Sequence, residues 1–113
     1  MAAAFDSFQA EVFTAIKVYI ADGSMEPDFP FGWIALIGPS PSLIVPGSAV
    51  CVELPNGVRV IRWFIRSLGN GSFLLAANPF LGQPRLSMTP KNSRVIGLVI
   101  DVESGQREFE ITC

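Results

Sequence analysis

Histidine is absent from this chain of 113 residues, and cysteine is scarce, with only Cys51 and Cys113 present. The two cysteines lack the spacing of metal ligands, and without histidine we expect no metal site and no cofactor. The same absence excludes every catalytic triad that uses histidine as its base. A nucleophilic serine or cysteine would therefore need a lysine, a carboxylate or a terminal amine as its base.

Charged residues are few, at 16% of the chain, and the formal net charge is −2. The eight basic residues are scattered, so nothing predicts direct binding to DNA phosphates. Long apolar runs are also missing, because the longest, such as Trp33 to Ile37 and Val95 to Val102, are far shorter than the ~18 residues that cross a membrane. Residues 1–4 lack the basic segment that begins a signal peptide. We expect a cytoplasmic protein with no membrane partner.

Apolar and turn-forming residues are abundant: half of the residues are hydrophobic, and there are nine prolines and ten glycines. A chain of this length fits one domain, residues 1–113, which buries roughly 65% of the surface that its unfolded form exposes. Phe5 and Phe8 stand at helical spacing. Residues 1–11 are therefore either a short helix or a flexible lead-in.

Short apolar segments alternate with Gly, Pro, Asn and Ser along the chain, which predicts an all-β fold of short antiparallel strands and hairpins. In the first strand, alternation places Ile16, Val18 and Ile20 on one face, with Lys17 and Tyr19 on the other. The predicted strands are Val12–Ala21, Trp33–Ile37, Ala49–Glu53, Val58–Arg66, Ser72–Ala77, Arg94–Glu103 and Arg107–Thr112.

Turn residues separate these segments. The dipeptides Asn56-Gly57, Asn70-Gly71 and Ser104-Gly105 predict hairpin turns, because these residue types tolerate a positive φ. The stretch Gly38 to Ser42 and the run Pro79 to Pro90 are predicted to be irregular loops, because proline lacks the N–H that a sheet needs.

An ordered series of motifs covers most of the chain, from about Val18 to Val102. The series comprises Asp22-Gly23-Ser24-Met25-Glu26-Pro27, Phe31-Gly32, Pro46-Gly47, Val60-Ile61-Arg62-Trp63-Phe64-Ile65-Arg66, Asn78-Pro79-Phe80 and Val95-Ile96-Gly97. Each motif is weak by itself, but their order resembles the C-terminal domain of LexA-like S24 peptidases. That family includes phage repressors of the lambda type and the UmuD mutagenesis subunits.

The resemblance implies a LexA-like fold and a serine–lysine peptidase site. Ser24 falls at the position of the nucleophile, and backbone N–H groups near Ser24 and Met25 fall where the family stabilises the oxyanion. The position of the general-base lysine is occupied by Arg62. Arginine stays protonated in proteins and cannot take the serine proton, and neither Lys17 nor Lys91 fits the role by motif.

The family cleaves its own chain at a bond such as Ala-Gly or Cys-Gly, and no such bond precedes Ser24. We therefore expect that this chain is not its own complete substrate and that its peptidase site is inactive. The implied function is a dimerisation and regulatory domain of a LexA-like or phage-repressor-like transcriptional regulator. A homodimer and a RecA-type filament are the implied partners, and DNA would be bound only through a domain absent from this chain.

Two alternatives remain open: an active, self-cleaving S24 serine peptidase and a UmuD-like stand-alone binding module. Simpler interpretations also apply to single residues. Ser24 is also typical of an ordinary turn residue. Arg62 is also typical of an ordinary strand arginine with an exposed head group, and Glu26 and Asp28 of solvated loop carboxylates. We expect Cys51 to be a buried small hydrophobe, and most of the aromatic residues to lie in the core, with one or two left for a dimer contact: Phe29, Phe31, Trp33, Trp63, Phe64 and Phe80.

Overall fold

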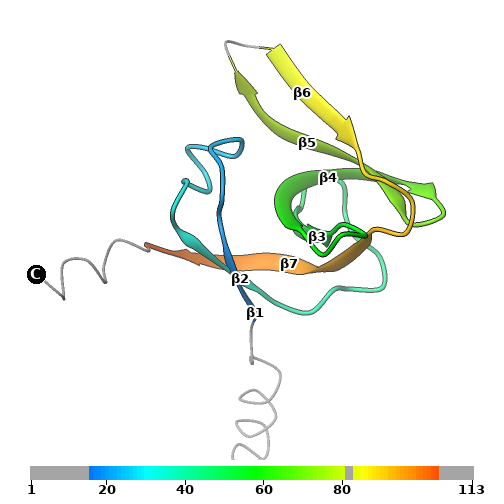
Figure 1. The fold of residues 1–113 in the computed structure, drawn as a ribbon, viewed down its shortest axis with the longest axis horizontal. Helices are drawn as coiled ribbons and strands as arrows, with labels where there is room; N and C mark the ends of the chain where they lie inside the picture. The colour runs from blue at the N-terminus through cyan, green and yellow to red at the C-terminus, as the bar shows by residue number, and fades with distance from the viewer. Residues whose placement is uncertain (1–15, 81–82, 105–113) are drawn as a thin grey trace, which may run out of the picture.

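The computed structural model describes residues 16–80 and 83–104. The described part contains no helix, and every strand pairing in it is antiparallel, which confirms the predicted all-β fold (Figure 1). The strands are β1 (Ile16–Tyr19), β2 (Ile34–Ile37), β3 (Ala49–Glu53), β4 (Arg59–Gly69), β5 (Ser72–Phe80), β6 (Gln83–Met88) and β7 (Arg94–Glu103).

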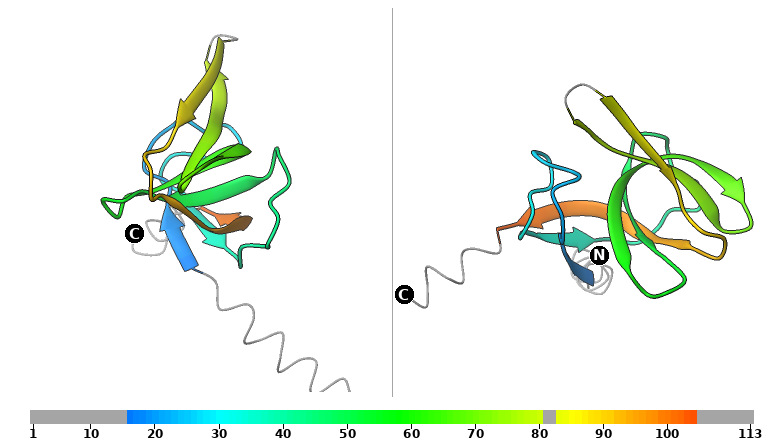
Figure 2. Two further views of the ribbon diagram at one scale, coloured as in Figure 1. Left: turned by 90° about the vertical axis from the view of Figure 1, so that its right-hand side faces the viewer. Right: turned by 45° about the horizontal axis from the view of Figure 1, so that its top comes forward.

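The strands follow the order β1-β2-β7-β3-β4-β5-β6, so the last strand in sequence lies in the middle of the sheet. One end of β7 pairs with β2 and the other pairs with β3. β4 curves strongly, and the β5–β6 hairpin projects away from the rest of the molecule (Figures 1 and 2). The sheet therefore has two unequal parts, joined through β7.

The described residues form two hydrophobic clusters, which meet at β3. The Cys51 cluster comprises Val18, Ile20, Ala35, Ile37, Cys51 and Ile61, and the Leu75 cluster comprises Val50, Val52, Phe64 and Leu75. Adjacent residues of β3 enter different clusters, because successive strand side chains point to opposite faces. Gly97 allows the end of β2 to lie close to β7, since a Cβ atom there would collide with the carbonyl oxygen of Gly38.

The predicted strands agree well with those of the structure. Ala49–Glu53 and Arg94–Glu103 have the predicted bounds, and β4 and β5 each run three residues further than predicted. β1 ends at Tyr19, two residues before the predicted end, but the predicted alternation is confirmed for Val18 and Ile20, which are buried, whereas Ile16 is 42% exposed at the start of the described chain. Residues 12–15 and the predicted strand Arg107–Thr112 lie outside the described residues, as do residues 1–11 and Cys113.

The prediction of an irregular loop from Pro79 to Pro90 was wrong, because β5 continues through Phe80 and β6 runs from Gln83 to Met88. The irregular part of the β5–β6 ladder accommodates both prolines. A register shift between Ala77 and Phe80 takes Pro79 out of the ladder, and Pro84 lies opposite this shift, on an edge strand. An edge strand needs only part of its N–H groups for the sheet.

Two of the predicted hairpin turns are confirmed. Asn70 and Gly71 both have positive φ, at 57° and 75°, and join β4 to β5. Gly57, with φ 89°, joins β3 to β4, and its N–H donates to the carbonyl of Leu54. The third turn includes Gly105, which lies outside the described residues. Gly38 to Ser42 is free of strand structure, as predicted.

The expected placement of the aromatic residues is largely confirmed. Phe64 is buried, and Phe29 and Trp33 pack against the Cys51 cluster. Phe31 is 54% exposed and contacts Tyr19 edge to face, with ring centroids 6.3 Å apart. The side chain of Phe80 lies outside the described residues.

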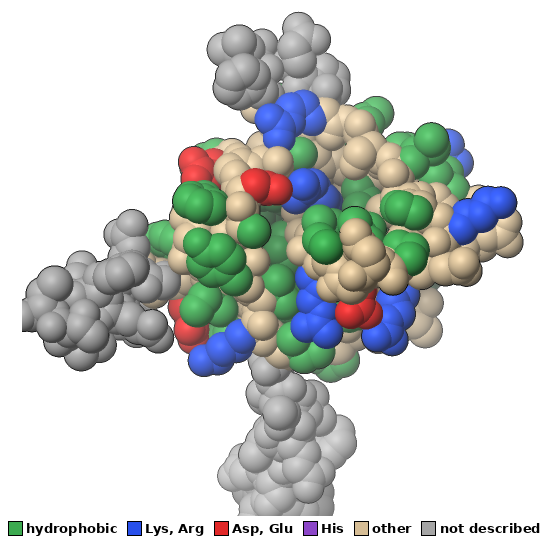
Figure 3. Space-filling model, viewed as in Figure 1, with side chains coloured by type: hydrophobic (Ala, Val, Ile, Leu, Met, Phe, Trp, Pro, Cys, Tyr) green, Lys and Arg blue, Asp and Glu red, His purple; other side chains and the backbone are tan. Residues whose placement is uncertain are grey.

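Cys51 is fully buried, as predicted, and burial raises the pKa of its thiol to about 11. Over residues 16–80 and 83–104, the structure has no helix with the length and apolar character needed to cross a membrane. On the face shown in Figure 3, Lys and Arg side chains are spread over the surface rather than gathered in one basic patch.

Candidate functional site

Ser24 lies in the compact turn that follows β1. Met25, only 1% exposed, anchors this turn in the interior, and its carbonyl accepts a hydrogen bond from the N–H of Phe29 at 2.9 Å. The N–H of Glu26 donates to the carbonyl of Gly23 at 3.2 Å. Ser24 itself is half-buried. The sequence motif therefore forms a tight turn that presents a serine next to a buried methionine.

Asn78 of β5 holds this turn against the second part of the sheet. Its side-chain Nδ2 donates to the carbonyls of Met25 and Glu26, both at 2.9 Å, and to Oδ2 of Asp28 at 2.8 Å. Its Oδ1 accepts a hydrogen bond of 2.7 Å from Nε1 of Trp63. One amide side chain thus fixes three points of the turn and is itself oriented by an indole N–H.

The backbone strengthens the same connection, because the N–H of Asn78 donates to the carbonyl of Ser24 at 3.0 Å. The register shift beyond Ala77 takes Asn78 out of the ladder to β6, so its amide is available to the turn. The position of Ser24 relative to β5 is therefore determined by both the backbone and the side chain of one residue.

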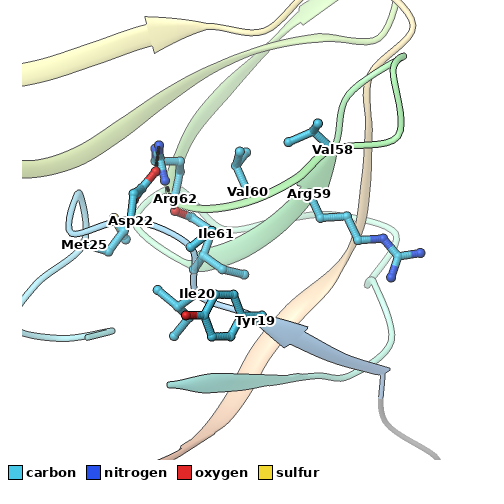
Figure 4. Close-up of a pocket in the computed structure, with 10 residues that line it drawn as sticks. Tyr19, Ile20, Asp22, Met25, Val58, Arg59, Val60, Ile61 and Arg62 are labelled. Carbon is cyan, nitrogen blue, oxygen red and sulfur yellow. Dashed lines mark hydrogen bonds and ion pairs between the residues drawn. The ribbon is translucent and has the colours of Figure 1, made fainter. Parts of the chain in front are cut away.

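Asp22 connects Ser24 to Arg62. Its Oδ1 accepts a hydrogen bond of 3.0 Å from the backbone N–H of Ser24, and its Oδ2 lies 3.5 Å from Nη2 of Arg62. The close-up shows the guanidinium of Arg62 directed from β4 toward the Asp22 carboxylate (Figure 4). The structure thus brings the predicted site residues Ser24 and Arg62 to the two sides of one carboxylate.

Several effects act on the acidity of Asp22. Partial burial raises its pKa, but the hydrogen bond from the N–H of Ser24 and the charge of Arg62 together outweigh burial. The pKa of Asp22 therefore lies below its ordinary value of 3.8. Asp22 is ionised at neutral pH and is a weak base, so it is poorly suited to take a proton from a serine hydroxyl.

Arg62 belongs to β4, where it pairs with Val50 of β3. Its side chain is 18% exposed, and Nη1 donates to the carbonyl of Ile61 at 2.7 Å. The simple interpretation of an ordinary strand arginine with an exposed head is therefore wrong. The aliphatic part of the side chain is enclosed, and the guanidinium makes defined contacts near the serine turn.

The two lysines of the chain lie elsewhere. Nζ of Lys17 is 4.0 Å from Oε1 of Glu103, on the β1–β2–β7 part of the sheet. Lys91 precedes Asn92, whose N–H donates to the carbonyl of Asn70 at the far end of β5 from Asn78. Neither lysine is placed to take a proton from Ser24.

The two expected oxyanion donors have different surroundings. The N–H of Ser24 is occupied by Asp22, whereas the N–H of Met25 donates to no acceptor among the described residues. An oxyanion at this turn would therefore find one available amide and one that is already bound to a carboxylate.

A small cavity of about 90 Å³ lies between the turn and the first half of β4 (Figure 4). Asp22 and Met25 line it on one side, and Arg62 does so on the other. The rest of its wall is mostly apolar and is formed by Tyr19, Ile20, Ala21, Val58, Val60 and Ile61, together with the stem of Arg59.

Sequence reasoning missed the roles of Asp22 and Asn78. A signal for Asp22 was present, because Asp two residues before a turn N–H is typical of an Asx-turn. Glu26 and Asp28 are exposed as expected, yet each accepts an internal hydrogen bond, Glu26 from the N–H of Phe31 at 3.0 Å and Asp28 from Asn78. Both carboxylates help to shape the turn.

No protein-family model matches this chain, and no curated protein shows significant sequence similarity to it.

Proposed function

We propose that this chain is the dimerisation and regulatory domain of a LexA-like or phage-repressor-like transcriptional regulator, with a peptidase site that has lost its base. The supporting observation is the Ser24 turn, which faces a strand cation through Asp22. Asp22 lies between the backbone of the Ser24 turn and Arg62, and the cation on the strand is a guanidinium, which does not accept a proton. The ordered motifs that resemble the family support the same proposal.

Exposed apolar side chains support a role in association. Among the described residues, the large hydrophobic side chains that are more than 40% exposed are Ile16, Tyr19, Phe31, Leu43, Val45, Val58, Leu86, Met88 and Ile100. Burial of such side chains against a second copy of the chain would stabilise an isologous dimer. A cytoplasmic location, a RecA-type filament as partner and DNA binding through a separate domain belong to the same proposal.

Sedimentation of the full chain over a concentration series tests the association. We expect a reversible monomer–dimer equilibrium, because an apolar interface of standard size gives dissociation constants in the micromolar range or below. Detection of monomer alone up to about 200 μM would contradict the dimerisation role.

An active S24 peptidase is the second candidate, and the available N–H of Met25 beside Ser24 favours it. A serine-directed phosphonate probe with mass-spectrometric detection distinguishes the two candidates. We expect no labelling of this chain or of Ser24→Ala, and labelling at Ser24 after Arg62→Lys, since lysine supplies a base that can lose its proton. Labelling of the unchanged chain at Ser24 would support the peptidase instead.

A further inference from the structure

Arg62 lines a second and larger pocket, of about 200 Å³, which lies between β4 and the β5–β6 hairpin. Most of the wall is apolar and is formed by Leu54, Val60, Leu75, Met88 and Pro90, while Ser87 and Thr89 contribute hydroxyls. Leu75 is buried and forms the floor, whereas Met88 is 71% exposed at the rim. The pocket therefore combines one cation with an apolar surface.

The guanidinium of Arg62 has N–H donors that no described residue accepts. Arginine carries five N–H donors, and among the described residues only the carbonyl of Ile61 and the carboxylate of Asp22 contact them. The contact to Asp22 is long, at 3.5 Å, and the Asp22 side chain is 55% exposed. Most of the hydrogen-bonding capacity of Arg62 is therefore unused by the protein, although the side chain is largely enclosed.

The charges of the pocket select the type of ligand. Arg62 is the one charged residue that lines it, and Asp22 already offsets part of that charge from outside the pocket, so a ligand with a single negative charge fits better than a dianionic phosphate. The planar guanidinium matches the geometry of a carboxylate, which can accept two parallel hydrogen bonds. The volume suits one aliphatic side chain, since a cavity of ~150 Å³ holds benzene.

We propose that this pocket binds the carboxyl terminus of a peptide whose last residue is aliphatic. The terminal carboxylate pairs with Arg62, and the aliphatic side chain lies against Val60, Leu75 and Met88. Since Arg62 also lines the cavity beside the serine turn, such a ligand competes with Asp22 for the guanidinium. This inference goes beyond the proposed regulatory function and does not depend on dimerisation or on the reactivity of Ser24.

The test uses two probes that differ only in charge: acetyl-Val-Leu with a free carboxyl terminus and the same dipeptide as its carboxamide. Binding to the full chain is followed by NMR of the methionine methyl groups, among which Met88 reports on the rim. We expect saturable binding of the acid at least tenfold tighter than that of the amide, because only the acid forms the charge-assisted pair. Equal binding of both probes, or no saturation by the acid up to about 10 mM, would overturn the proposal.

Variants locate the site. Arg62→Gln should remove the preference for the acid, and Asp22→Asn should strengthen acid binding by a few-fold, because it removes the internal competitor. Arg94→Gln is the matched control, since Arg94 pairs with Glu53 at the other end of β3 and β7 and should bind the acid like the unchanged chain. An unchanged acid preference in Arg62→Gln, or its loss in folded Arg94→Gln, would show that the pocket is not the site.

Discussion

The turn that carries Ser24 and the strand that carries Arg62 are held by different kinds of interaction. The turn is fixed by four hydrogen bonds from Asn78, which join segments 50 or more residues apart in sequence. The guanidinium of Arg62 is held by its neighbouring carbonyl and by one long ion pair to an exposed aspartate. The position of the serine is therefore built into the fold, whereas the charge opposite it is only loosely constrained.

This difference separates the residues that hold the turn in place from the residue that supplies its neighbouring charge. Neutral hydrogen bonds that replace water in a half-buried turn are costly to lose, because each leaves a group unpaired. A partly exposed ion pair contributes little to stability, so the cation is free to vary. Four predictions test this contrast, from the largest expected effect to the smallest.

Substitution of Asn78 by Ala should lower the free energy of unfolding by ~2–4 kcal/mol, because it removes an NH2 group that contacts three acceptors and also the acceptor for Trp63. Urea denaturation measures the change. Asn56→Ala is the matched control, since the Asn56 side chain accepts one hydrogen bond from the N–H of Val58 in an exposed turn and its loss should cost no more than about 1 kcal/mol. An equal loss of unfolding free energy in the two variants would show that Asn78 does not hold the turn more strongly than an ordinary turn residue does.

The thiol of Cys51 measures how rigid the sheet is beside Arg62, because Cys51 pairs with Ile61 on the adjacent strand. The thiol is fully buried and burial raises its pKa to about 11, so it is neutral at pH 8 and hidden from reagents. In a Cys113→Ser background, we expect reaction with Ellman's reagent at least about 100-fold slower than in urea-unfolded chain, since reaction requires local opening. Reaction at the unfolded rate would show that β3 and β4 separate freely.

The parts of the fold that the sequence predicts are those that depend on local chemistry. Asn70 and Gly71 adopt a positive φ because these two residue types tolerate it. Cys51 is buried because it lies in an apolar run. β6 was missed because Pro84 was judged as if it stood in a central strand. The strand tolerates this proline because β6 lies at the edge of the sheet, and that position exists only once the sheet has assembled.

The same distinction applies to the site. The motif around Ser24 predicts a turn, and the family resemblance singles out Arg62, but nothing local to Asn78 shows that its amide reaches a turn 53 residues away. The Asp22–Arg62 pair also joins distant segments. The sequence singles out Ser24 and Arg62 as candidates, whereas the interactions that position them depend on the tertiary structure.

Removal of the guanidinium by Arg62→Met should change the free energy of unfolding by no more than about 1 kcal/mol, because methionine preserves the packed aliphatic stem and Asp22 remains solvated. Urea denaturation of Arg62→Met and Asn78→Ala under the same conditions compares their free energies of unfolding directly. Arg94→Met, which breaks the 2.8 Å pair with Glu53, is the control for the loss of an ion pair elsewhere. A loss as large as that of Asn78→Ala would show that Arg62 supports the fold as much as the turn does.

The smallest effect is expected for Asp22→Asn, and it should depend on pH. The pKa of Asp22 is lowered in the folded chain, so its ionised form stabilises the fold above the unfolded pKa of about 3.8, and this contribution is lost as the pH falls through the lower folded pKa. Because the side chain is 55% exposed, solvent screening limits the difference from the unchanged chain to a few tenths of a kcal/mol at pH 7. Thermal unfolding from pH 7 to pH 2.5 should show the difference between the two chains shrinking as the pH falls below the unfolded pKa of about 3.8. If the difference instead grew as the pH fell, the pairing of Asp22 with Ser24 and Arg62 would not stabilise the fold.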